Sequence, residues 1–207
     1  WQPKYRYLNM NTDRLYWAGE DLNPSTVYYT AAAPANWSAL DANAVVVGWD
    51  ELGRINGMNE FGQLILVGKN DKIYSIDVTN AKADAIDSQT GLYSDRSIAN
   101  VWNSLVYLTD RWVDTLKPRQ SLAWASALES EPLDSDVSEL TIQIKELQLN
   151  ANCWWYIKRL NNYYFSFDTN NDNIPDTTLV YNSLTRSWTQ YEYPNLYDYG
   201  FYIDSDW

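Results

Sequence analysis

A run of oxygen-bearing side chains between residues 168 and 176 is the segment of this sequence best suited to chemistry. Asp168, Asn170, Asp172 and Asp176 occupy positions 1, 3, 5 and 9 of the run. Hard cations such as Ca²⁺ take about six to eight oxygen ligands in a flexible arrangement, which alternating Asp and Asn side chains can supply. The sequence therefore predicts a Ca²⁺ site formed by Asp168, Asn170, Asp172, the main-chain carbonyl of Ile174 and Asp176.

A purely structural interpretation of the same run stays open. In an EF-hand count, Asn173 stands where Gly is usual and Leu179 where a bidentate Glu is expected. Asn and Asp are also common turn residues, because their side chains hydrogen-bond to the backbone two residues further on. The alternatives are a cation-binding loop, as in integrin-like or thrombospondin-like modules, and a polar hairpin tip without an ion.

Other residue types that carry catalysis are scarce in this chain. His is absent and Cys153 is the single cysteine, so Ser-His-Asp and Cys-His arrangements and an internal disulfide are excluded. Cys153 stands among apolar residues and is interpreted as a buried small side chain. There is also no Gly-rich loop that would bind a phosphate. We therefore expect no enzymatic activity.

The composition favours contact surfaces over nucleic-acid binding. The chain of 207 residues contains 11 Trp and 17 Tyr but only 4 Phe. Amphipathic aromatic side chains suit half-buried strands and interfaces, where one end of the ring stays in water. The formal net charge of −12 argues against a protein that binds the phosphate backbone of DNA through clustered Lys and Arg. No apolar run is long enough for a transmembrane helix, so we expect no membrane partner.

Short apolar and aromatic runs separated by polar turns predict an all-β structure. The two runs that flank the oxygen-rich segment, 163–167 and 178–181, place it at the tip of a β-hairpin. Residues 68–71 form a second hairpin signal between two strands. Short strands at this spacing indicate a sandwich, barrel or propeller. The further predicted strands are residues 14–18, 26–30, 44–47, 62–67, 72–76, 97–101, 104–109 and 112–116, followed by a strand, turn and strand over 180–191.

One segment has a helical pattern. Apolar residues at 137, 140, 144 and 147 predict one short helix near residues 134–148, with Asp134 or Ser135 as its N-cap. The acidic residues from 129 to 139 are interpreted as the solvated N-terminal end of this helix. The alternation of Leu140, Ile142 and Ile144 keeps a strand open as the alternative.

The order of several motifs resembles the β-propeller virion proteins of tailed bacteriophages. The first motif joins residues 13–24, 27–30 and 36–38, and a similar blade follows at 53–57, 61–67 and 73–74. The next blade corresponds to residues 95–99, 103–110 and 113–116, the family's short helix to residues 140–147, and the closing blade to residues 163–167 and 179–182 with Trp188. The oxygen-rich loop is not a general feature of this family, so the Ca²⁺ prediction rests on its own residues.

The resemblance implies an antiparallel β-propeller fold and a structural function. Family members lie at the head-to-tail junction or in the tail, where they form rings around the DNA channel. We therefore expect a virion protein with a single propeller-like domain over residues 1–207, assembled with copies of itself in a six-fold ring. The expected neighbours are other tail or portal-proximal proteins, and DNA would pass without specific binding.

Two further expectations complete this interpretation. The chain begins without Met and residues 202–207 have the pattern of an unfinished strand, so we expect a segment of a longer protein. The alternative function is a carbohydrate-binding or glycan-cleaving propeller of a receptor-binding tail protein. Trp and Tyr faces suit sugar stacking, and pairs of Asp and Glu could act as acid and base.

Overall fold

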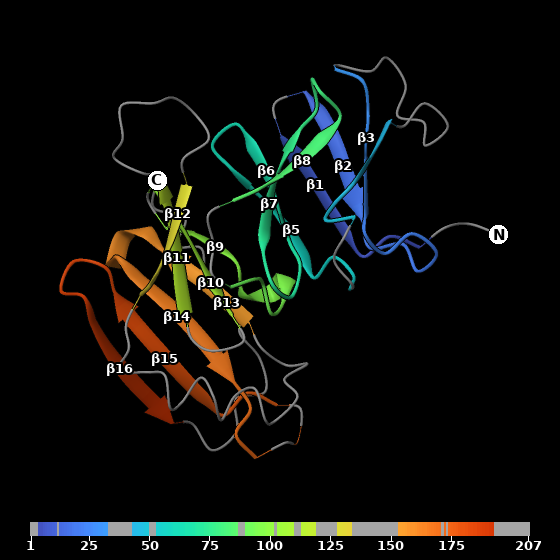
Figure 1. Ribbon diagram of the computed structural model, residues 1–207. Coiled ribbons are helices and arrows are strands. Elements are labelled where there is room, and N and C mark those ends of the chain that lie inside the picture. The colour runs from blue at the N-terminus through green and yellow to red at the C-terminus, as the bar shows by residue number, and fades with distance from the viewer. Residues whose placement is uncertain are drawn as a thin grey trace. The chain divides into compact units, whose positions relative to one another are not determined.

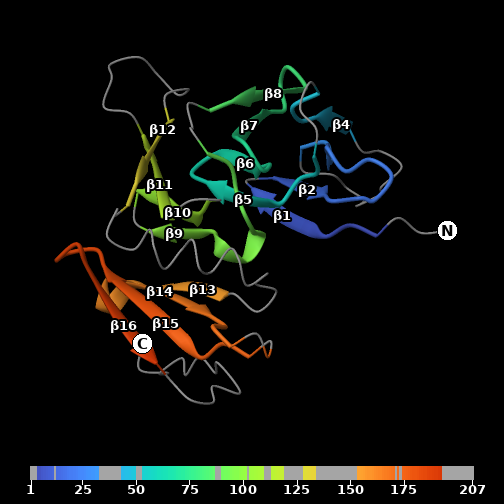
Figure 2. The same ribbon diagram turned by 60° about the horizontal axis from the view of Figure 1, so that its bottom comes forward.

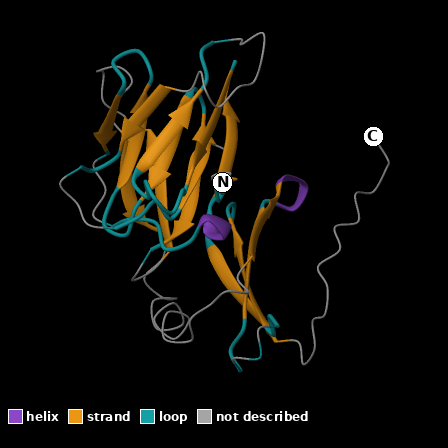
Figure 3. Cartoon of the chain, turned by 90° about the vertical axis from the view of Figure 1, so that its right-hand side faces the viewer, coloured by secondary structure: helices purple, strands orange, loops and turns teal. Residues whose placement is uncertain are grey.

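The computed structural model contains antiparallel sheets and almost no helix (Figures 1 and 3). It describes residues 4–11, 13–32, 43–49, 53–86, 90–101, 103–109, 113–118, 128–133, 153–170, 172 and 174–192. These residues form four sheets of four strands each. The chain divides into two compact units, Trp1–Ser138 and Glu139–Trp207, and each is described by itself.

The first unit contains three sheets in which each strand pairs with its neighbours in sequence. The first sheet is formed by β1 (Tyr7–Asn11), β2 (Arg14–Ala18), β3 (Thr26–Tyr29) and β4 (Asn43–Val46). The second is formed by β5 (Gly57–Phe61), β6 (Leu64–Gly68), β7 (Ile73–Asp77) and β8 (Lys82–Ala85). The third is formed by β9 (Ala99–Val101), β10 (Ser104–Leu108), β11 (Val113–Pro118) and β12 (Leu128–Pro132).

Apolar side chains on both faces of the second sheet hold the first unit together. Val67 of β6 belongs to a buried core that also contains Ala18 and Val27 of the first sheet. Leu66, the next residue of β6, belongs to a second core with Leu105 and Leu116 of the third sheet. Because successive side chains of a strand point to opposite faces, the second sheet is covered by a sheet on each side. Figure 2 shows the three sheets of this unit following one another along the chain.

The second unit contains one sheet, formed by β13 (Cys153–Ile157), β14 (Asn162–Phe167), β15 (Thr177–Asn182) and β16 (Ser187–Glu192). Its hairpins end in hydrogen-bonded turns. Asn182 Oδ1 accepts the N–H groups of Leu184 and Thr185 at 3.0 and 2.9 Å, and the carbonyl of Asn182 accepts the N–H of Arg186 at 2.8 Å. Arg186 has a φ of 55°, the left-handed conformation that closes the turn. On β15, a continuous buried run from Thr177 to Tyr181 lines both faces of the sheet.

The all-β, propeller-like prediction is confirmed, and most predicted strands lie within about two residues of their observed bounds. The β6–β7 and β14–β15 hairpins are those that the turn residues predicted. Strands β1, β5, β8, β12 and β13 were not among the predicted strands. Ser97, expected at the start of a strand, instead ends the 3₁₀ turn η2 (Asp95–Ser97) that precedes β9. The single propeller-like domain expected for residues 1–207 stays a prediction.

The acidic residues around 130 do not begin a helix, so that part of the prediction is wrong. Glu129 and Glu131 lie in β12, opposite Lys117 and Thr115 of β11. Lys117 forms an ion pair with Glu131, which stabilises this edge of the sheet. A polar edge strand has little apolar periodicity of its own, so its neighbour β11 decides its conformation.

Two predicted features lie outside the described residues. These are the short helix near 134–148 and the strand pattern at residues 202–207. Within the described residues the helical pieces are η2 and a second 3₁₀ turn, η3 (Lys158–Leu160). None of these described pieces has the length and apolar character that a membrane-crossing helix needs.

Candidate functional site

The oxygen-rich segment connects β14 to β15, at the hairpin where the sequence placed it. Asp168 is only 4% exposed, whereas Asn170 and Asp172 are exposed to solvent. Ile174 and Asp176 are half-buried. The segment therefore begins at the buried end of β14, and its tip is in water, as expected for a hairpin tip.

Three of the predicted ligands hold the backbone of their own loop. Asp168 Oδ1 accepts the N–H of Asn170 at 3.0 Å, and Asn170 Oδ1 accepts the N–H of Asp172 at 3.0 Å. Asp172 Oδ1 accepts the N–H of Ile174 at 2.8 Å. Each bond joins a side chain to the N–H two residues further on, which is the Asx-turn geometry. The spacing of positions 1, 3 and 5 therefore produces three successive turns.

The fourth side chain, Asp176, closes the loop. Asp176 Oδ1 accepts the N–H of Thr169 at 3.0 Å, and the Thr169 hydroxyl lies 2.8 Å from each carboxylate oxygen. The Thr177 hydroxyl donates to the same Oδ1 at 3.1 Å. The N–H of Asp176 in turn donates to the carbonyl of Phe167 at 3.1 Å. Asp176 therefore joins the two ends of the loop.

The described residues contain no group of three or more His, Cys, Asp or Glu side chains arranged to hold a metal ion. Asp168, Asp172 and Asp176 each have one carboxylate oxygen in a hydrogen bond to a backbone N–H of the loop. Amide and main-chain oxygens, such as those of Asn170 and Ile174, are also suitable Ca²⁺ ligands. The Ca²⁺ site at Asp168, Asn170, Asp172, Ile174 and Asp176 stays a prediction.

A second polar cluster, around Glu20, was not singled out from the sequence. Glu20 is 9% exposed. Its Oε2 accepts the hydroxyl of Tyr28 and the side-chain N–H of Asn23, both at 2.9 Å. Burial and this hydrogen bond to the carboxylate raise the pKa of Tyr28 to about 12. The carboxylate therefore braces the β2–β3 loop, where Asn23 precedes β3.

Aromatic rings pack next to this carboxylate. Trp17 stacks on Tyr28 with ring centroids 6.2 Å apart, and Tyr5 meets both rings edge-on at 6.1 and 5.8 Å. Aromatic rings near a carboxylate are the combination expected for sugar recognition. However, Trp17 is only 5% exposed, so its ring faces are already occupied by protein. The cluster is a packed support for the sheet and presents no open stacking face on Trp17.

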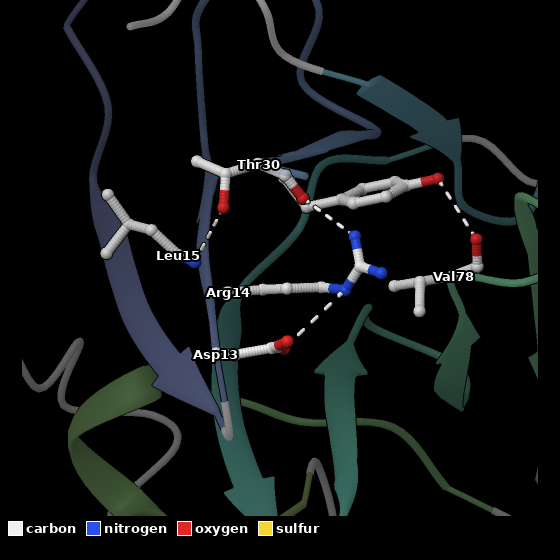
Figure 4. Close-up of polar contacts among 6 residues, drawn as sticks. Asp13, Arg14, Leu15, Thr30 and Val78 are labelled. Carbon is white, nitrogen blue, oxygen red and sulfur yellow. Dashed lines mark hydrogen bonds and ion pairs between the residues drawn. The ribbon is translucent and has the colours of Figure 1, made fainter. Parts of the chain in front are cut away.

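A polar junction joins the first and second sheets at another point (Figure 4). Arg14 Nη1 donates to the carbonyl of Thr30 at 2.9 Å, and its Nε lies 3.9 Å from Asp13 Oδ1. Thr30 Oγ1 accepts the N–H of Leu15 at 3.2 Å. The hydroxyl of Tyr29 donates to the carbonyl of Val78 at 3.4 Å, and so reaches the second sheet. The guanidinium is therefore used to hold β2 against the end of β3.

Lys69 is another charged side chain that is buried and hydrogen-bonded within the fold. It is 1% exposed, and its Nζ donates to the carbonyls of Gly48 and Val47 at 3.2 and 3.4 Å. It also lies 3.4 Å from Ser25 Oγ. The Lys side chain therefore connects the β6–β7 turn to the loop after β4.

Sequence comparisons give no family, whereas structure comparisons give the fold. No protein-family model matches the chain, and no curated protein matches it. Among solved structures, the extracellular domain of BT4673 from B. thetaiotaomicron is similar with a TM-score of 0.54 and 12% identity, over 91% of this chain and 25% of that one. The N-terminal domain of Nup159 is similar with a TM-score of 0.53 and 10% identity, over 92% of this chain and 48% of that one.

Both neighbours have β-propeller-type folds, and the likeness at this low identity shows the fold alone. The chain is a propeller-like arrangement of four-stranded antiparallel sheets. It spans about a quarter and about half of the lengths of these two solved chains.

Proposed function

We propose that this chain is a structural, non-enzymatic β-propeller component of a tailed-phage virion. The chain is one subunit of a six-fold ring. This ring surrounds the DNA channel in the tail or at the head-to-tail junction. Its partners are copies of itself and neighbouring tail or portal-proximal proteins. The resemblance in the order of motifs from residue 13 to about residue 193 motivates the phage assignment.

One observation supports a structural role: the charged side chains that could do chemistry are engaged in hydrogen bonds within the fold. Glu20, Arg14 and Lys69 each bind backbone or side-chain groups of the loops and strands around them. Asp168 and Asp176 do the same in the β14–β15 loop. Catalytic groups need a reacting atom within hydrogen-bond reach. These groups are occupied by the fold, which supports a scaffold over an enzyme.

The charge supports a channel through which DNA passes. The formal net charge is −12, with 27 Asp and Glu against 15 Lys and Arg. A negative wall repels the phosphate backbone, whereas a basic wall would hold it and slow its passage.

The test is the mass and symmetry of the assembled protein. We expect native mass spectrometry of the purified chain, or imaging of the particle that contains it, to give a closed cyclic assembly of six copies. A chain that stays monomeric at every concentration, both alone and in the presence of its virion neighbours, would contradict the proposal. Binding on a glycan array, with turnover that disappears when one carboxylate is replaced, would support the carbohydrate alternative instead.

A further inference from the structure

The charged residues of the second unit are separated by sign along its sheet. The basic residues at its described positions all lie in the β13–β14 and β15–β16 turns: Lys158, Arg159 and Arg186. These two turns lie side by side, because the N–H and the hydroxyl of Ser183 both donate to the carbonyl of Asn161, at 2.8 and 3.0 Å. We call residues 158–161 and 183–186 the basic end of the sheet.

The acidic residues lie at the opposite end of the same sheet. Those at described positions are Asp168, Asp172, Asp176 and Glu192. The first three belong to the β14–β15 loop, and Glu192 lies beside that loop because it pairs with Thr177, the first residue of β15. We call residues 168–176 together with Glu192 the acidic end. The strands between the ends have five or six residues, so the two ends are about 20 Å apart.

Charged side chains are exposed to solvent at both ends. Arg159 and Arg186 are exposed at the basic end, and Asp172 and Glu192 are exposed at the acidic end. With the described residues, neither arginine forms an ion pair. The positive charge of the basic end is therefore not neutralised within this part of the chain, and it suits an acidic partner.

The exposed large hydrophobic residues of this unit also lie at the two ends. Leu160 is 49% exposed and Leu184 is 72% exposed, and both lie in the turns of the basic end. Tyr191, which is 46% exposed, precedes Glu192 at the acidic end, where Ile174 is half-buried. At the described positions of this unit no other large hydrophobic residue is exposed. Each end thus combines apolar contact area with charge of one sign.

We infer that the basic end of one copy of this chain docks on the acidic end of the next copy. Opposite charges orient the two surfaces, and the apolar side chains add buried area. A two-fold contact between identical ends would bring like charges together, so the separation of charge favours a head-to-tail contact. Head-to-tail contacts are those that can close a ring, and this inference rests on the ring of the proposed function.

The apolar residues favour a protein surface over DNA as the partner. A phosphate backbone would pair with Arg159 and Arg186. It would leave the two exposed leucines of the basic end without an apolar contact. The acidic end of a second copy offers carboxylates for the arginines and the ring of Tyr191 for the leucines.

The test reverses the exposed charges at one end at a time. One variant carries Arg159→Glu and Arg186→Glu, and the other carries Asp172→Lys and Glu192→Lys. Each variant alone would bring like charges together at every contact, so we expect the dissociation constant of its oligomer to rise at least about tenfold. Sedimentation velocity over a range of concentrations measures this, in a chelator so that Ca²⁺ does not neutralise the acidic end.

An equal mixture of the two variants should assemble again. Each contact then pairs a reversed basic end with a reversed acidic end, or two unchanged ends, and both combinations attract. The two variants can alternate around a six-fold ring, because six is an even number. We expect the mixture to assemble like the wild type, which an unfolded variant would not permit.

Two further variants serve as controls. Lys4→Glu with Arg54→Glu makes the same change in net charge at two exposed residues of the first unit, and we expect wild-type assembly. Asp172 also holds its own loop, so Asp172→Asn with Glu192→Gln removes the charge but keeps an oxygen to accept the N–H of Ile174. We expect this variant to weaken assembly by about two- to tenfold. Near-ultraviolet circular dichroism checks the folding of every variant.

The outcomes separate this inference from the proposed function. An oligomer that forms equally well with the reversed basic end and with the neutral acidic end would overturn the end-to-end contact and leave the ring standing. A mixture of folded variants that does not assemble would also overturn it, in favour of another acidic partner for the basic end. A wild-type chain that never associates would overturn both the contact and the ring.

Discussion

In the β14–β15 loop, the side-chain oxygens of Asp168, Asn170 and Asp172 each accept the backbone N–H two residues further along the chain. Their spacing of two residues is visible in the sequence, and so is the hairpin that carries them. The sequence does not show that Asp176 spans the loop to reach Thr169. That contact depends on how the strands bring the two ends of the loop together.

Replacing Asp176 should therefore destabilise the hairpin. We predict that Asp176→Ala lowers the free energy of unfolding by about 0.5–1.5 kcal/mol, because the N–H and hydroxyl of Thr169 lose their acceptor and the two ends of the loop are no longer joined. Urea denaturation followed by tryptophan fluorescence measures the change. The control is Asp71→Ala in the exposed β6–β7 turn, for which we expect a change within about 0.5 kcal/mol. Equal effects of the two substitutions would contradict a special role for Asp176.

Calcium provides a separate test of the same loop. We predict that Ca²⁺ raises the melting temperature and that Asp172→Asn reduces this increase, because a ligand that binds only the folded state stabilises it. Calorimetry in Ca²⁺ and in a chelator measures both effects. No heat of binding and no change in melting temperature would leave the turn interpretation alone.

The raised pKa of Tyr28 leads us to predict that the protein loses stability at high pH. Burial, together with its hydrogen bond to Glu20, raises the pKa of Tyr28 to about 12, from its ordinary value of 10.0. The folded state then holds the phenolic proton more tightly than the unfolded state does. The stabilisation is complete below about pH 10 and is lost as the pH rises toward about 12.

Ultraviolet absorbance titration of tyrosine measures this effect. In Glu20→Gln the negative charge is absent, so we predict that the pKa of Tyr28 falls toward its ordinary value. The difference between the wild-type and Tyr28→Phe titration curves isolates this residue. A Tyr28 titration that is the same with and without the Glu20 carboxylate would show that burial alone sets the pKa.

The sheets of the first unit are joined by hydrophobic cores and also by close backbone contacts at glycine residues. A Cβ atom added at Gly57 would lie 2.6 Å from Leu92 Cδ2 and 2.7 Å from Asp95 Cα, and one added at Gly68 would overlap Leu92. Residues 92–95 therefore pack directly against β5 and β6. The sequence shows these glycines, but the neighbour that requires them lies more than twenty positions away in the chain.

Gly68→Ala should disturb this packing. We predict that it lowers the free energy of unfolding by about 1–3 kcal/mol, as overpacking of a dense core does. The comparison is Gly62→Ala in the β5–β6 turn, where a Cβ would meet no atom within 4 Å and only the φ of 60° is unfavourable. We expect the smaller loss there, about 1 kcal/mol. Thermal denaturation of the two variants shows which substitution costs more stability. A larger loss for Gly62→Ala than for Gly68→Ala would contradict the close packing on Leu92.

At the scale of the whole molecule, the acidity of the chain has a measurable consequence. We predict that the protein, including its assembled form, does not retain duplex DNA at physiological salt, because its net charge of −12 repels the phosphate backbone. Fluorescence anisotropy with labelled duplex DNA tests this, with a basic DNA-binding protein of similar mass as the positive control. Binding that weakens steeply as salt is raised would instead indicate a basic surface in contact with DNA.

The sequence by itself determined the class of fold and the strands with strong apolar or aromatic patterns, such as β6, β10 and β14. Side-chain alternation and turn residues are local properties, so they can be found without a structure. It also placed the Asp and Asn loop at a hairpin tip. It excluded His-based catalysis and predicted the absence of a membrane-spanning helix.

Only the tertiary structure decided the remaining features. Polar edge strands such as β8 and β12 take their conformation from the strand beside them, which pattern alone does not reveal. Apolar residues look alike in sequence, whether they lie in a core like Val27 or in water like Leu8. The register of the strands assigns each side chain to a face, and the stacking of the sheets decides which face is covered.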